Sequence, residues 1–317
     1  MIVTVTLNPT LDKTFGLPKL QLGELNRAQW IRQDLGGKGV NVSRALRALG
    51  LDSKIVSFVG GHTGRAMQDG LRAAGFDGRF VEIEGETRAN ITLFDEAANQ
   101  YTKINEPGPP VGPPHMAELT AQVEQLVQPD DLWAFCGSLP PGAPADLYAR
   151  LIERVQSRGG RAFLDTSGPA LRAGLTARPF ALKPNSEEAA ELLQFALRSD
   201  EEHFEAVGRL QAEGAAVVAL SRGADGLILA MSGEIVQARP PAVDARSPVG
   251  AGDSALAGLL WAVSAGCDPA ETARRAVACG TAAAMQEGTG VGDRALVEEL
   301  LKQVVITRPL TADGRPP

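Results

Sequence analysis

The stretch PVGAGDSALAGLLWAV, Pro248 to Val263, places two glycines and an aspartate directly ahead of a long apolar run. Fourteen uncharged residues follow Asp253, and their large apolar side chains recur at helical spacing. The segment therefore predicts a buried helix that begins at the glycines. Asp253 falls in its first turn, where backbone N–H groups have no partner within the helix. An aspartate at this place either caps the helix or faces a bound ligand.

The glycines make the ligand interpretation chemically specific. Gly250 and Gly252 permit backbone conformations that other residues avoid, so consecutive N–H groups can converge on one point. Such a group of donors, at the positive end of a helix dipole, suits a phosphate. A carboxylate beside it is a poor phosphate ligand, but it can accept a proton from a hydroxyl that attacks the phosphate. This stretch alone leaves capping and catalysis equally open.

Composition and charge limit the class of protein. The 317 residues are 44% hydrophobic, enough for a sizeable core, and the net charge of −7 disfavours a general nucleic-acid-binding surface. The three cysteines form no CxxC pair, which argues against a disulfide framework or a thiolate zinc site. The first residues predict a strand rather than a signal peptide, and no uncharged segment is long enough to span a bilayer. We therefore expect a soluble, cytoplasmic protein with no membrane or nucleic-acid partner.

Short apolar runs alternate with helix-period segments along most of the chain. The predicted strands are 1–7, 54–60, 131–136, 161–165, 180–183, 216–220 and 226–230. Strands that alternate with helices predict a mainly parallel sheet with helices on both faces. Two segments, about 11–34 and 87–104, break this alternation, and the second contains a predicted β-hairpin. We expect a single domain over 1–317, with a small β-sheet lid formed by these two segments.

A second glycine cluster, DLGGKGVNVSRAL, lies at Asp34–Leu46. It is not a P-loop, because Lys38 is followed by glycine rather than Ser or Thr and the four-residue spacer is missing. Gly37, Lys38 and Asn41 fit the binding of a polyol or its phosphate, but this motif alone favours a tight strand-to-helix turn with an exposed lysine. The stretch around Asp253 also matches G-x-G-x-x-A, although its late place in the chain and Pro248 disfavour a dinucleotide-binding enzyme.

Polar side chains follow several of the other predicted strands. Arg88 and Asn90 project from one face of the predicted hairpin, and Arg88 with Lys103 could bind a substrate phosphate or form a solvated face. Asn185 and Glu188 flank a predicted helix start, where they suit Mg²⁺ through its retained waters or form a capping box. Serine-hydrolase and histidine-metal chemistry lack support, because CGSLPPG is not G-x-S-x-G and the three histidines have no clear nucleophile partner.

Together these motifs are similar to those of a known family. TVTLNPTLD, GGKGVNV, GETRANI, GSLPPG, KPNSEE, SRGADG and VGAGDS resemble the ribokinase-like (PfkB-type) sugar kinases, in the family's order. TLNPTLD and TKINEPGP resemble the branch that holds 1-phosphofructokinase and tagatose-6-phosphate kinase. The resemblance implies a three-layer ribokinase-like α/β fold, with a mainly parallel central sheet flanked by helices and a small β-sheet lid.

The resemblance also implies an activity and a role for each matching residue. The activity is ATP-dependent phosphorylation of a ketohexose monophosphate, first fructose 1-phosphate, with tagatose 6-phosphate and fructose 6-phosphate as alternatives. Asp253 would be the catalytic base, beside an anion hole formed by Gly250, Ala251 and Gly252. The sugar and its phosphate would contact Asp12, Gly37, Lys38, Asn41, Arg88, Asn90, Lys103 and Ser138. The ATP site would include Lys183, Asn185, Ser221, Gly223, Gly226 and Thr281, with Mg²⁺ at Asn185 and Glu188.

Two departures from the family pattern stand out. Pro248 occupies a position where Thr is common, near contacts to the nucleotide or to a monovalent cation, and Thr10 occupies one where Ala or Ser is common. Neither is expected to touch the chemistry. Because family members often pair their lids, a homodimer through the lid is implied. A non-catalytic phosphosugar sensor of the same fold and an NAD-dependent enzyme remain as alternatives of other classes.

Overall fold

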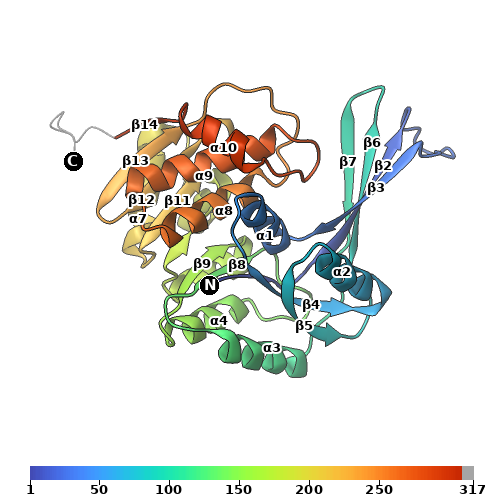
Figure 1. The fold of residues 1–317 in the computed structure, drawn as a ribbon, viewed down its shortest axis with the longest axis horizontal. Coiled ribbons are helices and arrows are strands. Elements are labelled where there is room, and N and C mark those ends of the chain that lie inside the picture. Colours follow the sequence, from blue (N-terminus) through green and yellow to red (C-terminus); the bar gives the residue numbers. More distant parts are fainter. Residues whose placement is uncertain (309–317) are drawn as a thin grey trace.

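The computed structural model describes residues 1–308 and contains two separate sheets (Figure 1). The strands of the large sheet lie in the order β14-β13-β12-β11-β10-β9-β8-β1-β4-β5. From β5 to β11 they run parallel, and β12, β13 and β14 continue the sheet antiparallel at one edge. The bounds are β1 Ile2–Thr6, β4 Lys54–Gly60, β5 Asp77–Ile83, β8 Leu132–Cys136, β9 Arg161–Asp165, β10 Ala181–Leu182, β11 Val217–Ser221, β12 Leu227–Met231, β13 Glu234–Arg239 and β14 Val305–Thr307.

The central strands are short, continuous apolar runs because both faces of the sheet are covered. Every residue of β1 and β8 is buried, which is the pattern that a parallel sheet between two helical layers requires. The prediction of a mainly parallel α/β sheet is therefore confirmed.

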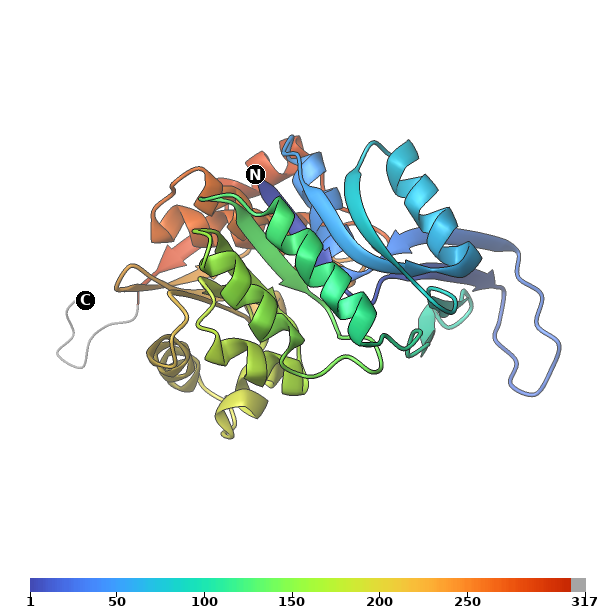
Figure 2. The ribbon, with the colours of Figure 1, turned by 90° about the horizontal axis from the view of Figure 1, so that it is seen from below.

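Two helical layers enclose the large sheet. Helices α1, α8, α9 and α10 share one core with it, and α3 to α7 share the core on the opposite face; Figure 2 shows α3 and α4 lying across that face. The bounds are α1 Lys38–Ala48, α2 Gly61–Ala73, α3 Pro113–Leu126, α4 Leu147–Gln156, α5 Gly168–Thr176, α6 Ser186–Leu193, α7 Asp200–Ala212, α8 Ala251–Ser264, α9 Pro269–Ala284 and α10 Arg294–Leu301. No helix among residues 1–308 is long and apolar enough to cross a membrane.

The small sheet projects from one end of this body (Figure 1). Its strand order is β3-β2-β6-β7, with bounds β2 Thr10–Leu17, β3 Trp30–Gly36, β6 Ala89–Asp95 and β7 Gln100–Asn105. β2 and β6 pair in parallel, while β3 and β7 flank them antiparallel. The chain enters this sheet directly after β1 and returns from it directly into α1, so residues at its base lie beside the start of α1.

Several elements have no counterpart in the sequence-based prediction. They are β5, α3, α5, α7, β13 and β14. The proline- and glycine-rich segment 106–114 leads into α3, and Pro113 and Pro114 are tolerated in its first turn because no N–H partner is needed there. β14 is the edge strand and β13 lies next to it, and both have exposed ends, so they lack the continuous apolar run of the central strands.

Candidate active site

Asp253 occupies the first turn of α8 but does not cap it. The helix is capped by Gly250, whose φ of 81° lies in the left-handed region that favours glycine, and no side chain accepts a capping hydrogen bond there. The Asp253 side chain is only 7% exposed, and its Oδ2 accepts a hydrogen bond of 2.8 Å from Asn41 Nδ2 of α1. The capping interpretation of Asp253 is therefore wrong, because this carboxylate faces a neighbouring helix rather than its own N–H groups.

A second buried carboxylate, Asp165, lies at the end of β9 and contacts two lysines. Lys38 Nζ lies 2.7 Å from its Oδ1, and Lys183 Nζ lies 3.0 Å from its Oδ2. Asp165 and Lys183 are almost fully buried, at 1% and 5% exposure. A Cβ added to Gly252 would stand 3.6 Å from Lys183 Nζ, so this ammonium group lies beside the glycine turn of α8. Four separate segments thus bring two cations and two carboxylates together.

Burial and charge shift the pKa values of this cluster in opposite directions. Burial, reinforced by the charge of Asp165, raises the pKa of Asp253 to about 6, although Lys38 and the Asn41 hydrogen bond oppose the rise. Burial also opposes ionisation of Asp165, but Lys183 and Lys38 outweigh it and hold the pKa of Asp165 below its usual value. Burial would lower the pKa of Lys38, yet the Asp165 carboxylate raises it well above the ordinary range. The cluster therefore holds one firmly ionised carboxylate and one that titrates near pH 6.

The glycine cluster before α1 fixes the position of Asn41. Gly37 is the N-cap of α1 with a φ of 110°, and a Cβ on it would collide with Thr6. This close approach seats the first turn of α1 on β1, which places Lys38 at Asp165 and Asn41 at Asp253. The Asp253 carboxylate accepts the hydrogen bond of the Asn41 amide nitrogen. Asn41 Oδ1 is therefore left buried without a hydrogen-bond partner among the described residues. An unsatisfied buried acceptor of this kind can accept a hydrogen bond from a ligand hydroxyl.

Asn185 and Glu188 form a capping box at the start of α6. Asn185 Oδ1 accepts the Glu188 N–H at 2.8 Å, and Glu188 Oε2 accepts the Asn185 N–H at 2.9 Å. The ordinary structural explanation of this motif is thus present in the geometry. Glu188 is also close enough to raise the pKa of Lys38 by its charge, so its second carboxylate oxygen belongs to the same electrostatic neighbourhood as Asp165.

The remaining residues predicted for a nucleotide site lie on three segments. Ser221 pairs with Asn185, so SRGADG adjoins the capping box. Gly226 is required by the fold, because a Cβ there would overlap the Ala238 carbonyl, whereas Gly223 faces open space. The hydroxyl of Thr281 donates to Val277 within α9 at 2.8 Å, so it is committed to its own helix.

At the base of the small sheet, Asp12 and Asn90 lie opposite each other on paired strands. Asn90 Nδ2 donates to Asp12 Oδ1 at 3.1 Å, and burial raises the pKa of Asp12 above its usual value. The two predicted sugar contacts are therefore brought together. Lys103 is not brought to Arg88: the strand register pairs Lys103 with Thr92, further along the hairpin, where it is exposed.

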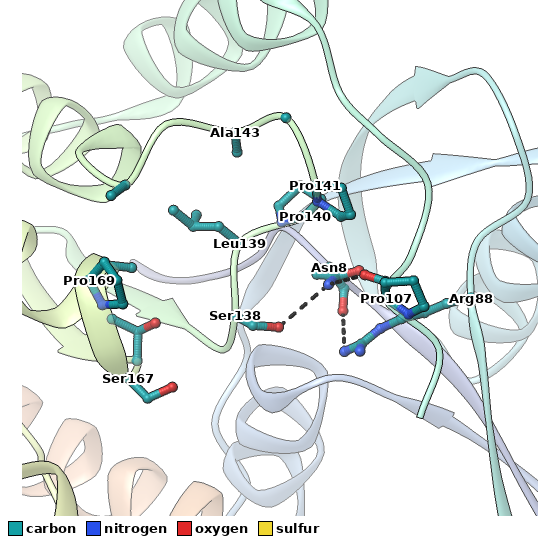
Figure 3. Close-up of a pocket in the computed structure, with 14 residues that line it drawn as sticks. Asn8, Arg88, Pro107, Ser138, Leu139, Pro140, Pro141, Ala143, Ser167 and Pro169 are labelled. Carbon is teal, nitrogen blue, oxygen red and sulfur yellow. Dashed lines mark hydrogen bonds between the residues drawn. The ribbon is translucent and has the colours of Figure 1, made fainter. Parts of the chain in front are cut away.

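Arg88 and Ser138 line a hollow of about 520 Å³ at the carboxyl ends of β8 and β9 (Figure 3). Arg88 donates to three backbone carbonyls, those of Asn8, Pro9 and Glu106. These three acceptors are neutral, while the carboxylates of Asp12 and Glu106 act on the guanidinium by their charge. Asn8 donates to Ser138 Oγ at 3.4 Å, and across the hollow stand Ser167 and Pro169 at the start of α5.

Comparison with known proteins places this arrangement in a family. Residues 6–295 match the pfkB family carbohydrate kinases. The chain belongs to the pfkB family of carbohydrate kinases. It is 40% identical over 278 residues to the 1-phosphofructokinase of Rhodobacter capsulatus, covering 87% of this chain and 88% of the relative. It is 35% identical over 308 residues to the 1-phosphofructokinase of Bacillus subtilis, covering 97% of this chain and all of the relative (100%).

Solved structures agree with this assignment to the pfkB family. Phosphofructokinase-2 from Escherichia coli in complex with potassium superimposes with a TM-score of 0.91 at 28% identity, covering 95% of this chain and 98% of that one. The same E. coli enzyme has been solved in complex with fructose-6-phosphate and in a tetrameric inhibited form. The predicted ribokinase-like fold and the resemblance to PfkB-type kinases are therefore confirmed.

Two residues of this pfkB-family site carry no role in the prediction from sequence. Asp165 ends β9 and holds both lysines, and Asn8 joins Arg88 to Ser138 through its backbone carbonyl and its amide. A signal existed for Asp165, because it is an acidic residue at the carboxyl end of a predicted parallel strand, which is the edge where such sheets bind ligands. Asn8 lies within TLNPTLD, but its partners come from distant segments that no local pattern reveals.

Proposed function

We propose that this chain transfers the terminal phosphoryl group of ATP to a hydroxyl of a ketohexose monophosphate, with fructose 1-phosphate as the acceptor. The observation that carries the proposal is the buried Asp253 carboxylate in the first turn of α8, beside a glycine turn and Lys183. The acceptor is supported by the relatives from R. capsulatus and B. subtilis, both named 1-phosphofructokinase.

In this proposal Asp253 removes the proton from the attacking hydroxyl. A pKa of about 6 suits a general base at neutral pH, because the group is ionised yet more basic than an ordinary carboxylate. Asn41 fixes the carboxylate by its hydrogen bond to Oδ2, which leaves the other oxygen for the substrate. Positioning of this kind is most of what phosphoryl transfer requires from a protein.

In this proposal, backbone amides and lysines stabilise the negative charge of the transferred phosphoryl group. The N–H groups of Gly250, Ala251 and Gly252 form the proposed anion hole at the positive end of α8. Lys183 lies next to this turn and contacts the Asp165 carboxylate. Lys38 contacts the same Asp165 carboxylate from α1. Once Asp253 has taken the proton of the hydroxyl, the two lysines and the ionised Asp165 leave a net positive charge, which stabilises the phosphoryl group as its charge spreads onto the oxygens.

Mg²⁺ would associate with Glu188, whose carboxylate keeps one oxygen outside the capping box. No group of three or more His, Cys, Asp or Glu residues that could hold a metal ion exists within residues 1–308. Such sparse donors fit Mg²⁺, which is usually held by one or two carboxylates together with waters and substrate phosphates. When bound, the ion would neutralise phosphate charge. A monovalent cation stays a prediction from the family resemblance.

The phosphate already present on the acceptor would occupy the hollow at Arg88 and Ser138. There the guanidinium, the Ser138 hydroxyl and the hydroxyls near the start of α5 surround a space of about 520 Å³. The sugar would then lie between this hollow and Asp253, against Asp12, Asn90 and Asn41. Closure of the small sheet over the sugar would exclude water that could otherwise take the phosphoryl group.

A coupled ADP-release assay tests this function on fructose 1-phosphate, fructose 6-phosphate and tagatose 6-phosphate. We expect the highest kcat/KM with fructose 1-phosphate. Fructose 6-phosphate is the second candidate, because the E. coli structure contains that sugar. ADP release that is fastest with another phosphosugar would correct the acceptor, and ligand binding without ATP consumption would support a non-catalytic sensor instead.

We also propose that two copies pair through the outer face of the small sheet. Strand alternation places Ile31 and Ile104 on the face opposite to Asp12, and both are more than half exposed. Exposed apolar side chains on a sheet that projects from the body favour burial against a second copy. The E. coli enzyme also has a tetrameric form, which two such dimers of this chain could form by pairing.

The double variant Ile31→Asp/Ile104→Asp tests this pairing. Charges on the buried face of a homodimer are costly, so sedimentation should show a monomer where the unaltered chain is a dimer or tetramer. Val305→Asp, an equally exposed apolar residue on β14, serves as the control and should leave the assembly intact. An unaltered chain that sediments as a monomer, or a double variant that keeps its assembly, would contradict the proposal.

A further inference from the structure

Thr10 lies at the base of the small sheet, where β2 begins, and is only 3% exposed. Its hydroxyl has two partners. Oγ1 donates to Asp12 Oδ1 at 3.3 Å and accepts the backbone N–H of Asn90 at 3.1 Å. Thr10 therefore joins the two strands that carry the proposed sugar contacts, Asp12 on β2 and Asn90 on β6.

The side chain of Thr10 is held in one orientation. Thr10 is paired with Gly36 of β3, and a Cβ added to Gly36 would stand 3.0 Å from the Thr10 methyl group and would overlap the Asp12 carboxylate. The methyl thus packs against the bare glycine backbone. Because a β-branched side chain has few χ1 rotamers, this contact directs the hydroxyl toward Asp12 and Asn90.

The hydrogen bonds around Asp12 determine which way the Asn90 amide points. A carboxylate only accepts hydrogen bonds, so Asp12 is the acceptor for Asn90 Nδ2. Asn90 Oδ1 therefore points away from Asp12. That oxygen is buried and has no hydrogen-bond partner among the described residues. Asn41 Oδ1 is left in the same condition by Asp253. Two fixed, unsatisfied acceptors, each beside a carboxylate, match a ligand that supplies several hydroxyl donors.

We propose that Thr10 is a positioning residue for the acceptor sugar. Its hydroxyl holds the Asp12–Asn90 pair so that Asn90 Oδ1 accepts a hydrogen bond from a sugar hydroxyl. The inference rests on the proposed function, because it takes the ligand at Asp12 and Asn90 to be the acceptor. It also revises the expectation from sequence that Thr10 has no bearing on the chemistry.

The test compares Thr10→Val with Thr10→Ser, using fructose 1-phosphate as the acceptor. Valine keeps the shape but loses the hydroxyl, so the KM for the acceptor should rise about tenfold, the effect of one lost hydrogen bond with its partners left unpaired. kcat and the KM for ATP should stay within about twofold, since Thr10 does not contact the Asp253 cluster. Serine keeps the hydroxyl and should restore most of the affinity.

Thr14→Val is the matched control, because Thr14 is buried on the same strand and the same face. It should leave the KM for the acceptor unchanged. Monodeoxy analogues of the acceptor supply a second readout: the unaltered chain should discriminate strongly against the analogue that lacks the hydroxyl read by Asn90, and Thr10→Val should lose this discrimination.

The outcomes separate this inference from the function on which it rests. Equal KM values for Thr10→Val and Thr14→Val, or equal losses in Thr10→Val and Thr10→Ser, would overturn the role of the hydroxyl while the kinase activity stands. An unaltered chain that phosphorylates no ketohexose phosphate would overturn the proposed function and this inference together. Retained discrimination against every analogue in Thr10→Val would also contradict the inference.

Discussion

Asp253→Asn should lower kcat by about 10²- to 10⁴-fold, the usual contribution of a general base. ATP binding should persist, because the variant keeps the glycine turn and both lysines. The measurement is steady-state ADP release together with equilibrium ATP binding. Asp268→Asn is the matched control: Asp268 is a true cap, whose side chain accepts the Glu271 N–H at the start of α9, and asparagine caps as well. Normal turnover in Asp253→Asn would remove the base from the mechanism.

The same substitution should make the folded protein more stable at pH 8. Burial raises the pKa of Asp253 from 3.8 in a model peptide to about 6, so above pH 6 the native state carries a buried charge that the unfolded chain hydrates freely. The difference corresponds to about 3 kcal/mol. Below the unfolded pKa both states are protonated, and the gain should vanish. Urea unfolding of both chains at pH 8 and below pH 3.8 measures this, and a variant that is less stable at pH 8 would contradict it.

Much of the fold was predictable because the central strands are recognisable in the sequence as continuous apolar runs. β1, β4, β8 and β9 are apolar runs separated by helical segments, and the parallel sheet follows from that alternation. β13, β14 and α3 were not predicted, since both strands have exposed ends and the first turn of α3 contains two prolines. Their assignment depends on neighbours that a local pattern does not contain.

The site was predictable where one motif supplies its own geometry, and less so where distant strands meet. Asp253 could be found because the glycines, the aspartate and the apolar helix are contiguous. The register of the small sheet could not: β2 pairs with β6 in parallel, which puts Asp12 opposite Asn90 and leaves Lys103 opposite Thr92. Thr10 was set aside for the same reason, because both of its hydrogen bonds depend on that pairing.

Asp165→Asn should shift the acidic limb of the kcat/KM profile to lower pH. Among the charges around Asp253, the Asp165 carboxylate contributes most to its raised pKa, and Lys38 and Lys183 oppose it. Removing the carboxylate leaves the two lysines free to favour ionisation of Asp253. The unaltered chain should lose activity as the pH falls through about 6, and the variant should lose it at a lower pH. Asp34→Asn, which breaks the more exposed pair with Arg32, should not move the limb.

Asp165→Asn should also destabilise the fold, because it leaves the buried Lys183 without its partner. Breaking a buried pair on one side typically costs about 3–5 kcal/mol. The pKa of Asp165 is lowered in the folded state, so this loss should be full at neutral pH, above the unfolded pKa, and should shrink as acid protonates the carboxylate of the unaltered chain. Adding Lys183→Met removes the stranded cation and should recover part of the stability, which a double-mutant cycle by urea unfolding would reveal. Additive losses in the cycle, together with an unmoved acidic limb, would mean that Asp165 neither holds Lys183 nor sets the basicity of Asp253.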